Sequence, residues 1–338
     1  MKTAILLVNI GTPDSPDIAD VRKFIIRYLT DPRVMNIPWI WRHLLVRGVI
    51  VPFRARKSTK AYRQLWTDKG SPLLYYLDAL QRKVQEQLPA AEVWAAVRYG
   101  SPDIAQVMAE MSTRGYEQLT IVPLFPQYAS STVGTIEDGV RKAVAQWTSP
   151  PQMTVIRQFS DYAPFIDLWS RNIRAWRPEN YDRLVFSFHG LPLNHLPKRC
   201  RNTQGGQVCN CLSHNGELHD WETENYCYRA NCYTLAAQIA KSLGLENQQY
   251  TVSFQSRLTK GWLQPFTDSL LEEYGRKGMR VLLAAPSFVA DCLETTVELD
   301  IENKNRFLAA GGAALDRVPS LNIQDEWVKA LVSLCNKH

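Results

Sequence analysis

Several features that define other protein classes are missing from this sequence. It has no uncharged apolar run of about 18 residues, so we expect no membrane-spanning helix. It has no long Lys/Arg tract, which argues against nucleic acid as a partner. It also has no glycine loop of the phosphate-binding kind, so we expect no nucleotide site.

Secretory features are absent as well. The opening stretch MKTAILLVNIGTP has one basic residue and a short apolar run but no small-residue cleavage site. We interpret it as the first strand of a cytoplasmic protein.

Cysteine is scarce outside one segment. Five of the seven cysteines fall in one short window of a chain without secretory features, which argues against a disulfide framework and favours a metal site. These five are Cys200, Cys209, Cys211, Cys227 and Cys232. Zinc held by four cysteines, or with His214 or His219 as a ligand, is one candidate, and five unligated thiols are another.

The composition describes a globular protein with more than one core. The chain has 338 residues, 45% of them hydrophobic and 21% charged, which is enough for two domains of ordinary size. Its formal net charge of +6 favours anionic partners such as phosphates, carboxylate-bearing ligands or a lipid surface.

Apolar strands alternate with helix patterns along the chain. This alternation predicts an α/β fold in which parallel sheets are flanked by helices on both faces. The expected strands are 4–10, 93–99, 119–122, 183–188 and 281–285.

Two parts of the sequence resemble each other. The strand that ends in Gly11-Thr12-Pro13 is echoed by the strand that ends at Gly190-Leu191-Pro192, and residues 119–132 parallel residues 281–296. The second alignment places Pro123 against Pro286 and Phe125 against Phe288. We therefore predict two similar Rossmann-like halves with the ligand cleft between them, because ligands bind beyond the carboxyl ends of strands in such sheets.

The halves are expected to be 1–155 and 156–320, followed by a C-terminal helix at 321–338. Residues 150–182 contain Pro150, Pro151, Pro164 and Pro178 and are interpreted as the passage between the halves.

The segment 34–57 is rich in Ile, Val and Trp but is interrupted by Arg42, His43 and Arg47. These charges make a membrane crossing costly. Basic residues interleaved with Trp39 and Trp41 instead suit an apolar lip that touches a membrane surface, and a buried loop and helix is the alternative.

An acidic row follows the strand at 281–285. We expect a helix from residue 293, with Leu293, Val297 and Ile301 on one face. Glu294, Glu298 and Glu302 form the row beside that face, where like charges four residues apart repel each other. Carboxylates in a file can pass protons or a divalent cation, and a solvated acidic face is the alternative.

His189 comes directly after an apolar strand and before a Gly-x-Pro turn. An imidazole on such a rigid support, with a pKa near neutrality, suits a base or a metal ligand, and a purely structural histidine is the alternative. Glu294 is the expected partner, because it follows the corresponding strand of the same half and a His/Glu pair can bind a divalent ion or share protons.

Several long motifs, in order along nearly the whole chain, resemble the ferrochelatase family. They are VRYGSP (97–102), PQYASSTVG (126–134), FSFHGLP (186–192), FQSR (254–257) and GWLQP (261–265). The resemblance implies a chelatase fold of two Rossmann-like halves with a porphyrin cleft. It also implies insertion of Fe²⁺ into protoporphyrin IX to form protoheme, the last step of heme synthesis.

The resemblance further implies roles for individual residues. His189 and Glu294 match the family's essential histidine and glutamate, and Glu298 and Glu302 match its acidic row. The residues that match the lining of the macrocycle site are Ile10, Arg98, Tyr128, Trp262 and Phe288.

The cysteine-rich segment departs from the usual family pattern. Some bacterial members hold a [2Fe–2S] cluster in an internal segment of this kind, for which four of the five cysteines would suffice. Structural zinc is the alternative.

Three other activities are kept open. They are insertion of iron into coproporphyrin III, insertion of another divalent metal, and a heme- or iron-responsive binding protein. We also expect the protein to make peripheral contact with the inner membrane.

Overall fold

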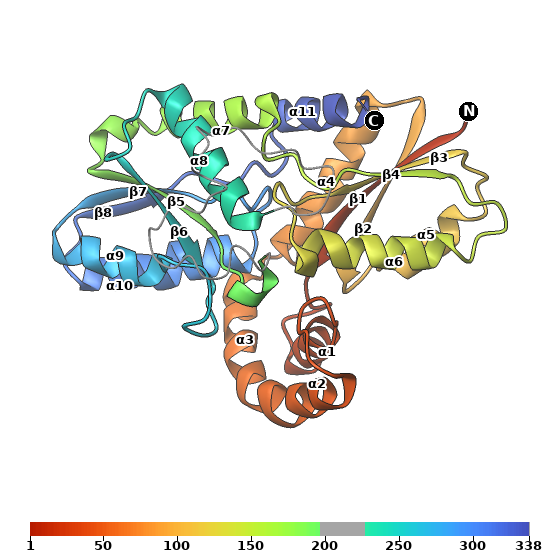
Figure 1. The fold of residues 1–338 in the computed structure, drawn as a ribbon, viewed down its shortest axis with the longest axis horizontal. Coiled ribbons are helices and arrows are strands. Elements are labelled where there is room, and N and C mark those ends of the chain that lie inside the picture. The colour runs from red at the N-terminus through yellow and green to blue at the C-terminus, as the bar shows by residue number, and fades with distance from the viewer. Residues whose placement is uncertain (197–226, 338) are drawn as a thin grey trace. The chain divides into compact units, whose positions relative to one another are not determined.

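The structure is a computed structural model, and it describes residues 1–196 and 227–337. It divides into two compact units (Figure 1). Unit 1 comprises Met1–Phe125, Ser130–Arg157 and Leu321–His338. Unit 2 comprises Pro126–Ala129 and Gln158–Ser320.

Unit 1 is built on a parallel four-stranded sheet in the order β2-β1-β3-β4. Its strands are β1 (Thr3–Gly11), β2 (Ala91–Tyr99), β3 (Gln118–Pro123) and β4 (Gln152–Val155). The helices that accompany it are α1 (Ile18–Leu29), α4 (Pro72–Gln87), α5 (Ile104–Met111), α6 (Thr135–Val144) and α11 (Asp325–Cys335). The expected strands at 4–10, 93–99 and 119–122 are confirmed.

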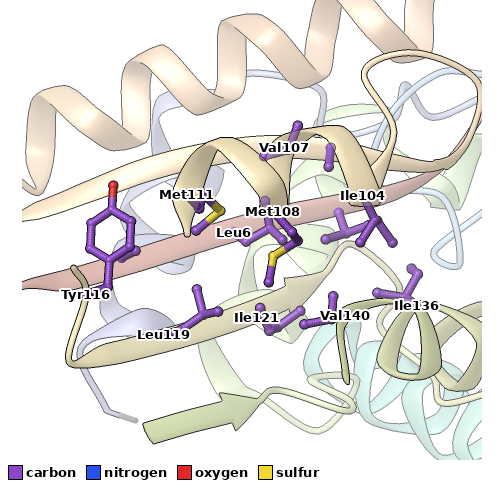
Figure 2. Close-up of a cluster of buried hydrophobic side chains, with 13 residues drawn as sticks. Leu6, Ile104, Val107, Met108, Met111, Tyr116, Leu119, Ile121, Ile136 and Val140 are labelled. Carbon is purple, nitrogen blue, oxygen red and sulfur yellow. The ribbon is translucent and has the colours of Figure 1, made fainter. Parts of the chain in front are cut away.

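The core of unit 1 explains why the central strand is apolar throughout. Ala4, Leu6 and Val8 pack with α5 and α6 on one face of the sheet, in the cluster shown in Figure 2. The alternate residues Ile5 and Leu7 point to the other face and are also buried. A strand buried on both faces has no reason to alternate apolar and polar residues, which is typical of parallel sheets covered by helices.

Unit 2 repeats this plan with the order β6-β5-β7-β8, again all parallel. Its strands are β5 (Arg183–His189), β6 (Tyr250–Gln255), β7 (Arg280–Ala284) and β8 (Ala314–Arg317). Its helices are α7 (Ala163–Ala175), α8 (Tyr228–Leu243), α9 (Thr267–Arg276), the π-helix η6 (Leu293–Asn303) and α10 (Lys304–Ala309), with short 3₁₀ turns η3 (Pro178–Asn180) and η4 (Leu193–His195). The prediction of two Rossmann-like halves, each a parallel sheet flanked by helices, is confirmed.

The two sheets correspond strand by strand. Val97 N–H donates to the carbonyl of Pro102 in unit 1, and Phe254 N–H donates to the carbonyl of Pro265 in unit 2, both at 2.8 Å. The ladder aligns Leu7 with Val122 in one sheet and Phe186 with Ala284 in the other.

This register has two consequences. His189 occupies the place that Ile10 has in unit 1, and Gln255 occupies the place of Arg98. It also sets Pro123 against Ala285, so the alignment of Pro123 with Pro286 is wrong by one residue. Apolar runs carry no marker that fixes register to a single residue.

The proline-rich stretch 150–182 is not a simple passage. It contains the edge strand β4 and all of helix α7. Pro150 and Pro151 precede the strand, and Pro164 lies in the first turn of α7, where its missing N–H costs nothing. These prolines mark the starts of elements instead of a loop.

The segment 34–57 forms the helix α2 (Trp39–Leu45), a π-turn η1 (Val46–Ile50) and the start of α3 (Val51–Leu65). Arg42 and Val46 are buried, but the segment also carries exposed apolar side chains. These are Trp39, Ile40, Trp41, Leu44, Val49 and Phe53, and we call them the lip. None of the helices in the described residues is long and apolar enough to cross a bilayer.

Candidate functional site

His189 is the last residue of β5, held in the ladder opposite Gln255 of β6. Its Nδ1 lies 2.6 Å from the carbonyl oxygen of Gly190. A carbonyl only accepts hydrogen bonds, so Nδ1 carries the proton in the neutral ring and Nε2 keeps its lone pair. The half-buried imidazole is therefore set up to accept a proton or to meet a metal through Nε2.

Two aromatic side chains flank this imidazole. The ring centroid of Trp262 lies 6.5 Å from that of His189, and the ring centroid of Phe288 lies 6.2 Å away. The loop that carries Trp262 is fixed to the loop after β5, because Leu263 N–H donates to the carbonyl of Leu191 at 2.9 Å. The imidazole of His189 therefore lies beside two aromatic rings in an apolar environment.

The acidic row lies on a π-helix, η6, and not on an ordinary α-helix. The expected apolar face is only partly confirmed, since Val297 is buried while Leu293 and Ile301 are half-buried. The buried positions are instead Thr295, Val297, Leu299 and Asn303. Hydrogen bonds from i to i+5 widen the turn, so the face that an α-helical period predicts is displaced. The π-helix is a rare element, and where it is found it is often at a functional site.

The carboxylate of Glu298 accepts two hydrogen bonds from Ser256, the residue that follows β6. The backbone N–H of Ser256 donates to Oε1 of Glu298 at 2.7 Å, and the Ser256 hydroxyl donates to Oε2. Ser256 has a φ of 63°, in the left-handed region that non-glycine residues rarely adopt. Strain of this kind clusters at functional sites, and here it directs two donors at one carboxylate.

The environment of Glu298 favours its protonated form. Burial raises the pKa of its carboxyl above the ordinary value, and the charge of Glu294 raises it further. The Ser256 hydrogen bonds act in the opposite direction, as does His189 when its imidazole is protonated, but they do not cancel the rise in this pKa. His189 and Glu294 therefore lie close enough to Glu298 to act on its pKa.

Arg317 of β8 fixes η6 from the other side. Its buried guanidinium donates through Nη2 to Asp291 at 3.1 Å, just before the helix, and to Asp300 at 2.7 Å, within it. Nε also donates to Asp300, at 2.8 Å. The two-pronged guanidinium thus ties both ends of the segment that carries Glu294 and Glu298 to the sheet.

Cys292 precedes η6 and is buried. Burial raises the pKa of its thiol well above the usual value, and the neighbouring charge of Glu294 adds to this. The backbone N–H of Cys292 donates to the hydroxyl of Thr295 at 3.0 Å at the start of η6, so we assign Cys292 a structural role.

In unit 1, Arg98 belongs to a buried polar network. Its Nη2 lies 2.8 Å from Asp31, and its Nε donates to the carbonyl and hydroxyl of Thr135. Burial opposes ionisation of Asp31, but hydrogen bonds from Thr135, the Arg33 N–H and Tyr99, together with the charge of Arg98, lower its pKa below the ordinary value. Arg98 therefore acts as the structural counter-ion of Asp31, and part of its side chain remains exposed.

The remaining predicted residues are placed as follows. Ile10 lies near the end of β1, Tyr128 lies in the connection after β3, and Glu302 lies on η6 beyond Glu298. All three are half-buried.

Thus the structure brings His189, Trp262, Phe288, Glu294 and Glu298 together within unit 2. The sequence reasoning missed Gln255, Ser256 and Arg317, and also Tyr228, whose hydroxyl bonds the carbonyl of His189. The motif FQSR contained the first two, but nothing in its letters shows a left-handed serine.

The described residues include only two of the five cysteines that were predicted to bind a metal. Within residues 1–196 and 227–337, no group of three His, Cys, Asp or Glu side chains is arranged to hold a metal ion. Cys200, Cys209 and Cys211 lie outside the described residues. Cys227 occupies the N-cap position of α8, and Cys232 lies within that helix, both buried.

Comparison with known proteins identifies the family. The family model described as Ferrochelatase matches residues 2–338. The chain belongs to the ferrochelatase family. It is 37% identical to a ferrochelatase of Pseudomonas putida over 340 residues, covering 99% of this chain and 98% of the relative. It is also 37% identical to a ferrochelatase of Legionella pneumophila, covering 100% and 99%.

Solved structures agree on the fold. SirB from Bacillus subtilis with Fe³⁺ superposes with a TM-score of 0.57 at 10% identity, covering 100% of this chain and 95% of that one. CbiX, a terminal enzyme of siroheme biosynthesis, superposes with a TM-score of 0.51 at 13% identity, covering 99% and 98%. At these identities the likeness concerns the chelatase fold alone. Membership of the ferrochelatase family identifies an enzyme of heme synthesis that inserts iron into porphyrin.

Proposed function

We propose that this enzyme inserts Fe²⁺ into protoporphyrin IX to form protoheme, with His189 and Glu294 at the reacting centre. The observation that carries the proposal is the imidazole at the end of β5, whose Nδ1 lies 2.6 Å from the carbonyl oxygen of Gly190 and whose ring lies beside Trp262 and Phe288. Metal entry releases two protons from pyrrole nitrogens, so the site needs an acceptor for protons as well as a ligand for iron.

The roles of the side chains follow from this demand. Nε2 of His189 accepts a pyrrole proton or meets the iron, and Glu294 offers carboxylate oxygens, which suit a borderline divalent cation. Glu298, whose pKa is raised, takes protons onward, and Glu302 extends the row along η6. A general base at this position contributes typically about 10²–10⁴-fold to a rate.

We assign porphyrin contact to Ile10 and Arg98 of unit 1 and to Tyr128, Trp262 and Phe288 of unit 2. The flanking of His189 by Trp262 and Phe288 supports this, because a large flat apolar ring needs aromatic surface. In this proposal residues 1–155 supply the lip, residues 156–320 supply the metal-handling groups, and residues 321–338 end the chain as a helix.

We also propose that the enzyme is cytoplasmic and touches the inner membrane through the lip. Phe53 is 82% exposed, and Trp39 and Trp41 are 65% and 67% exposed. Exposed basic residues, among them Arg47 and Arg54, accompany them, which suits an anionic lipid surface. Sedimentation with anionic vesicles tests this. Wild type should pellet, and a Trp41→Ser, Phe53→Ser double variant should stay in the supernatant.

We propose a [2Fe–2S] cluster as a resident cofactor, held by Cys200, Cys209, Cys211 and Cys227. Cys227 fits a thiolate ligand, because it occupies the N-cap position of α8, where negative charge is favoured. Cys232 fits the spare position. Its thiol is buried within α8 and bonds the hydroxyl of Tyr228. The visible spectrum of purified protein separates a cluster from the zinc alternative, since only the cluster is coloured.

A metallation assay with two porphyrins tests the substrate. Purified enzyme with Fe²⁺ under anaerobic conditions should convert protoporphyrin IX faster than coproporphyrin III. The reverse preference would establish the coproporphyrin alternative. The same assay with Zn²⁺ and Co²⁺ tests whether another divalent metal is preferred.

A further inference from the structure

A chain of buried polar side chains lies behind the acidic row. Ser253 and Ser187 are completely buried on neighbouring strands, and Thr267 is completely buried at the start of α9. The Thr267 hydroxyl lies 2.9 Å from the hydroxyls of both serines. Gln255, which is 2% exposed, continues the chain, because Ser187 donates to its Oε1 at 2.7 Å.

The hydrogen bonds of this chain run in one direction. The amide oxygen of Gln255 can only accept, so Ser187 uses its single hydroxyl proton there. Thr267 is then the donor to Ser187, and Ser253 is the donor to Thr267 at 2.9 Å, the shorter of its two contacts, since the carbonyl oxygen of Phe186 lies 3.5 Å away. The orientation of the amide follows from the other side, because the backbone carbonyl of Glu294 can only accept and therefore requires the NH₂ group of Gln255 to face η6, and Ser187 stabilises this orientation by donating to the amide oxygen.

The NH₂ group of Gln255 meets the acidic row directly. It lies 3.1 Å from the backbone carbonyl oxygen of Glu294 and 3.5 Å from Oε2 of Glu298. In unit 1 the corresponding residue, Arg98, likewise donates to a backbone carbonyl at the start of the helix after the third strand, that of Thr135. Both units therefore use this position to hold that helix, but only unit 2 places an oriented amide there.

We propose that Gln255 is a positioning residue for iron handling, which holds Glu294 and Glu298 at the reacting centre and is itself oriented by Ser187. This inference rests on the proposed roles of Glu294 and Glu298. Without the amide, the turn of η6 at Glu294 loses a backbone anchor, while the aromatic residues beside His189 keep their own contacts. The consequence is a defect in the use of iron and not in porphyrin binding.

A double-mutant cycle tests the proposal. Gln255→Met, of similar length but without donors, should lower kcat/KM for Fe²⁺ about tenfold while the KM for protoporphyrin IX changes less than about twofold. Ser187→Ala should lower kcat/KM for Fe²⁺ about threefold. The double variant should be no worse than Gln255→Met alone, because Ser187 acts through the amide.

Ser170→Ala provides the matched control. This serine is also buried in unit 2, with its hydroxyl bonded to the carbonyl of Ile166 at 2.8 Å, but it lies on α7 away from the chain. Its effect on kcat/KM should be small and additive with Gln255→Met. Two results would overturn the inference. In one, the losses of kcat/KM from Ser187→Ala and Gln255→Met add in the double variant. In the other, Gln255→Met lowers kcat/KM for Fe²⁺ and for protoporphyrin IX equally. If Gln255→Met does not fold, Ser187→Ala alone decides, and an unchanged kcat/KM for Fe²⁺ in that variant overturns the inference.

Glu294→Gln and Glu298→Gln separate the inference from the proposal on which it rests. If both keep wild-type kinetics, the proposed roles of the acidic row fail. If both lose activity while Gln255→Met keeps it, only the role of Gln255 fails.

Discussion

The hydroxyl of Tyr228 donates a hydrogen bond to the backbone carbonyl of His189, at 2.8 Å. Tyr228 is the first residue of α8 and directly follows Cys227, so this bond joins the end of the cysteine-rich segment to the strand that carries the histidine. The same hydroxyl lies 3.4 Å from that of Ser287, which in turn bonds Gln127 at 3.2 Å. The carbonyl at the end of β5 is thus satisfied from outside the sheet.

Tyr228→Phe is expected to destabilise the protein by about 1–3 kcal/mol and to lower kcat, because a buried carbonyl beside the imidazole loses its donor. Thermal unfolding and metallation rates measure the two effects. Tyr274→Phe is the control. It removes another buried tyrosine hydroxyl, bonded to Thr251 at 3.0 Å, and should affect stability but not kcat. Equal kcat in both variants would show that the bond does not support His189.

Substitution of Cys227 and of Cys232 should show which of the two binds the cluster. Cys227→Ser is expected to abolish the visible iron–sulfur absorption, since a hydroxyl is a poor replacement for a thiolate ligand. Cys232→Ser should retain the absorption, because its thiol lies inside α8 and already bonds the hydroxyl of Tyr228. Absorption and iron content per chain measure the outcome. Loss of the chromophore in Cys232→Ser but not in Cys227→Ser would reverse the assignment.

The ion pairs of Arg317 predict a stability effect that depends on geometry as well as charge. Arg317→Met leaves Asp291 and Asp300 without their cation and should cost about 2–3 kcal/mol, less than for a fully buried pair because Asp300 is partly exposed. Arg317→Lys keeps the charge but cannot bridge both carboxylates in the same way, so an intermediate loss is expected. Thermal midpoints of the three proteins measure this. A lysine variant as stable as wild type would show that charge alone suffices.

Glu137 predicts a pH dependence of stability. Hydrogen bonds from Arg157, opposed by burial and supported by Arg141, lower the pKa of its carboxyl below the ordinary value of 4.5. A lowered pKa in the folded state stabilises the protein above the unfolded pKa, and this stabilisation is lost as the pH falls through the folded pKa. Glu137→Gln should therefore be less stable than wild type at pH 7, by about 1 kcal/mol given the exposed arginines.

The difference between Glu137→Gln and wild type should shrink progressively as the pH falls below about 4.5. Thermal midpoints measured from pH 7 to pH 3 check the trend. Glu110→Gln, which alters an exposed pair with Arg114 in the same unit, should show little difference at any pH. A difference for Glu137→Gln that stays constant with pH would contradict the assignment.

The sequence predicted the parallel strands well, because their residues are buried on both faces and form apolar runs such as Ala4 to Val8. It also predicted the position of His189 at the end of a strand and of Glu294 on a helix. Both depend on local patterns that the tertiary structure reinforces.

Other features depend on contacts between distant segments, which local patterns do not show. The π-helical turn of η6 departs from the α-helical period, and Arg317, which ties it down, follows it in the next strand. The left-handed conformation of Ser256 is held by its bonds to Glu298, far along the chain. Gln255 resembled any strand residue until its partners Ser187 and Glu294 were known.

The central claim is that His189 and Glu294 act together in metal insertion. The most direct measurement is the rate of heme formation from Fe²⁺ and protoporphyrin IX by wild type, His189→Ala and Glu294→Gln, with each protein first shown to be folded by thermal unfolding. Each variant is expected to lose at least about 100-fold in kcat, in line with removal of a general base or a ligand from the reacting centre. Rates within about twofold of wild type in both variants would contradict the account.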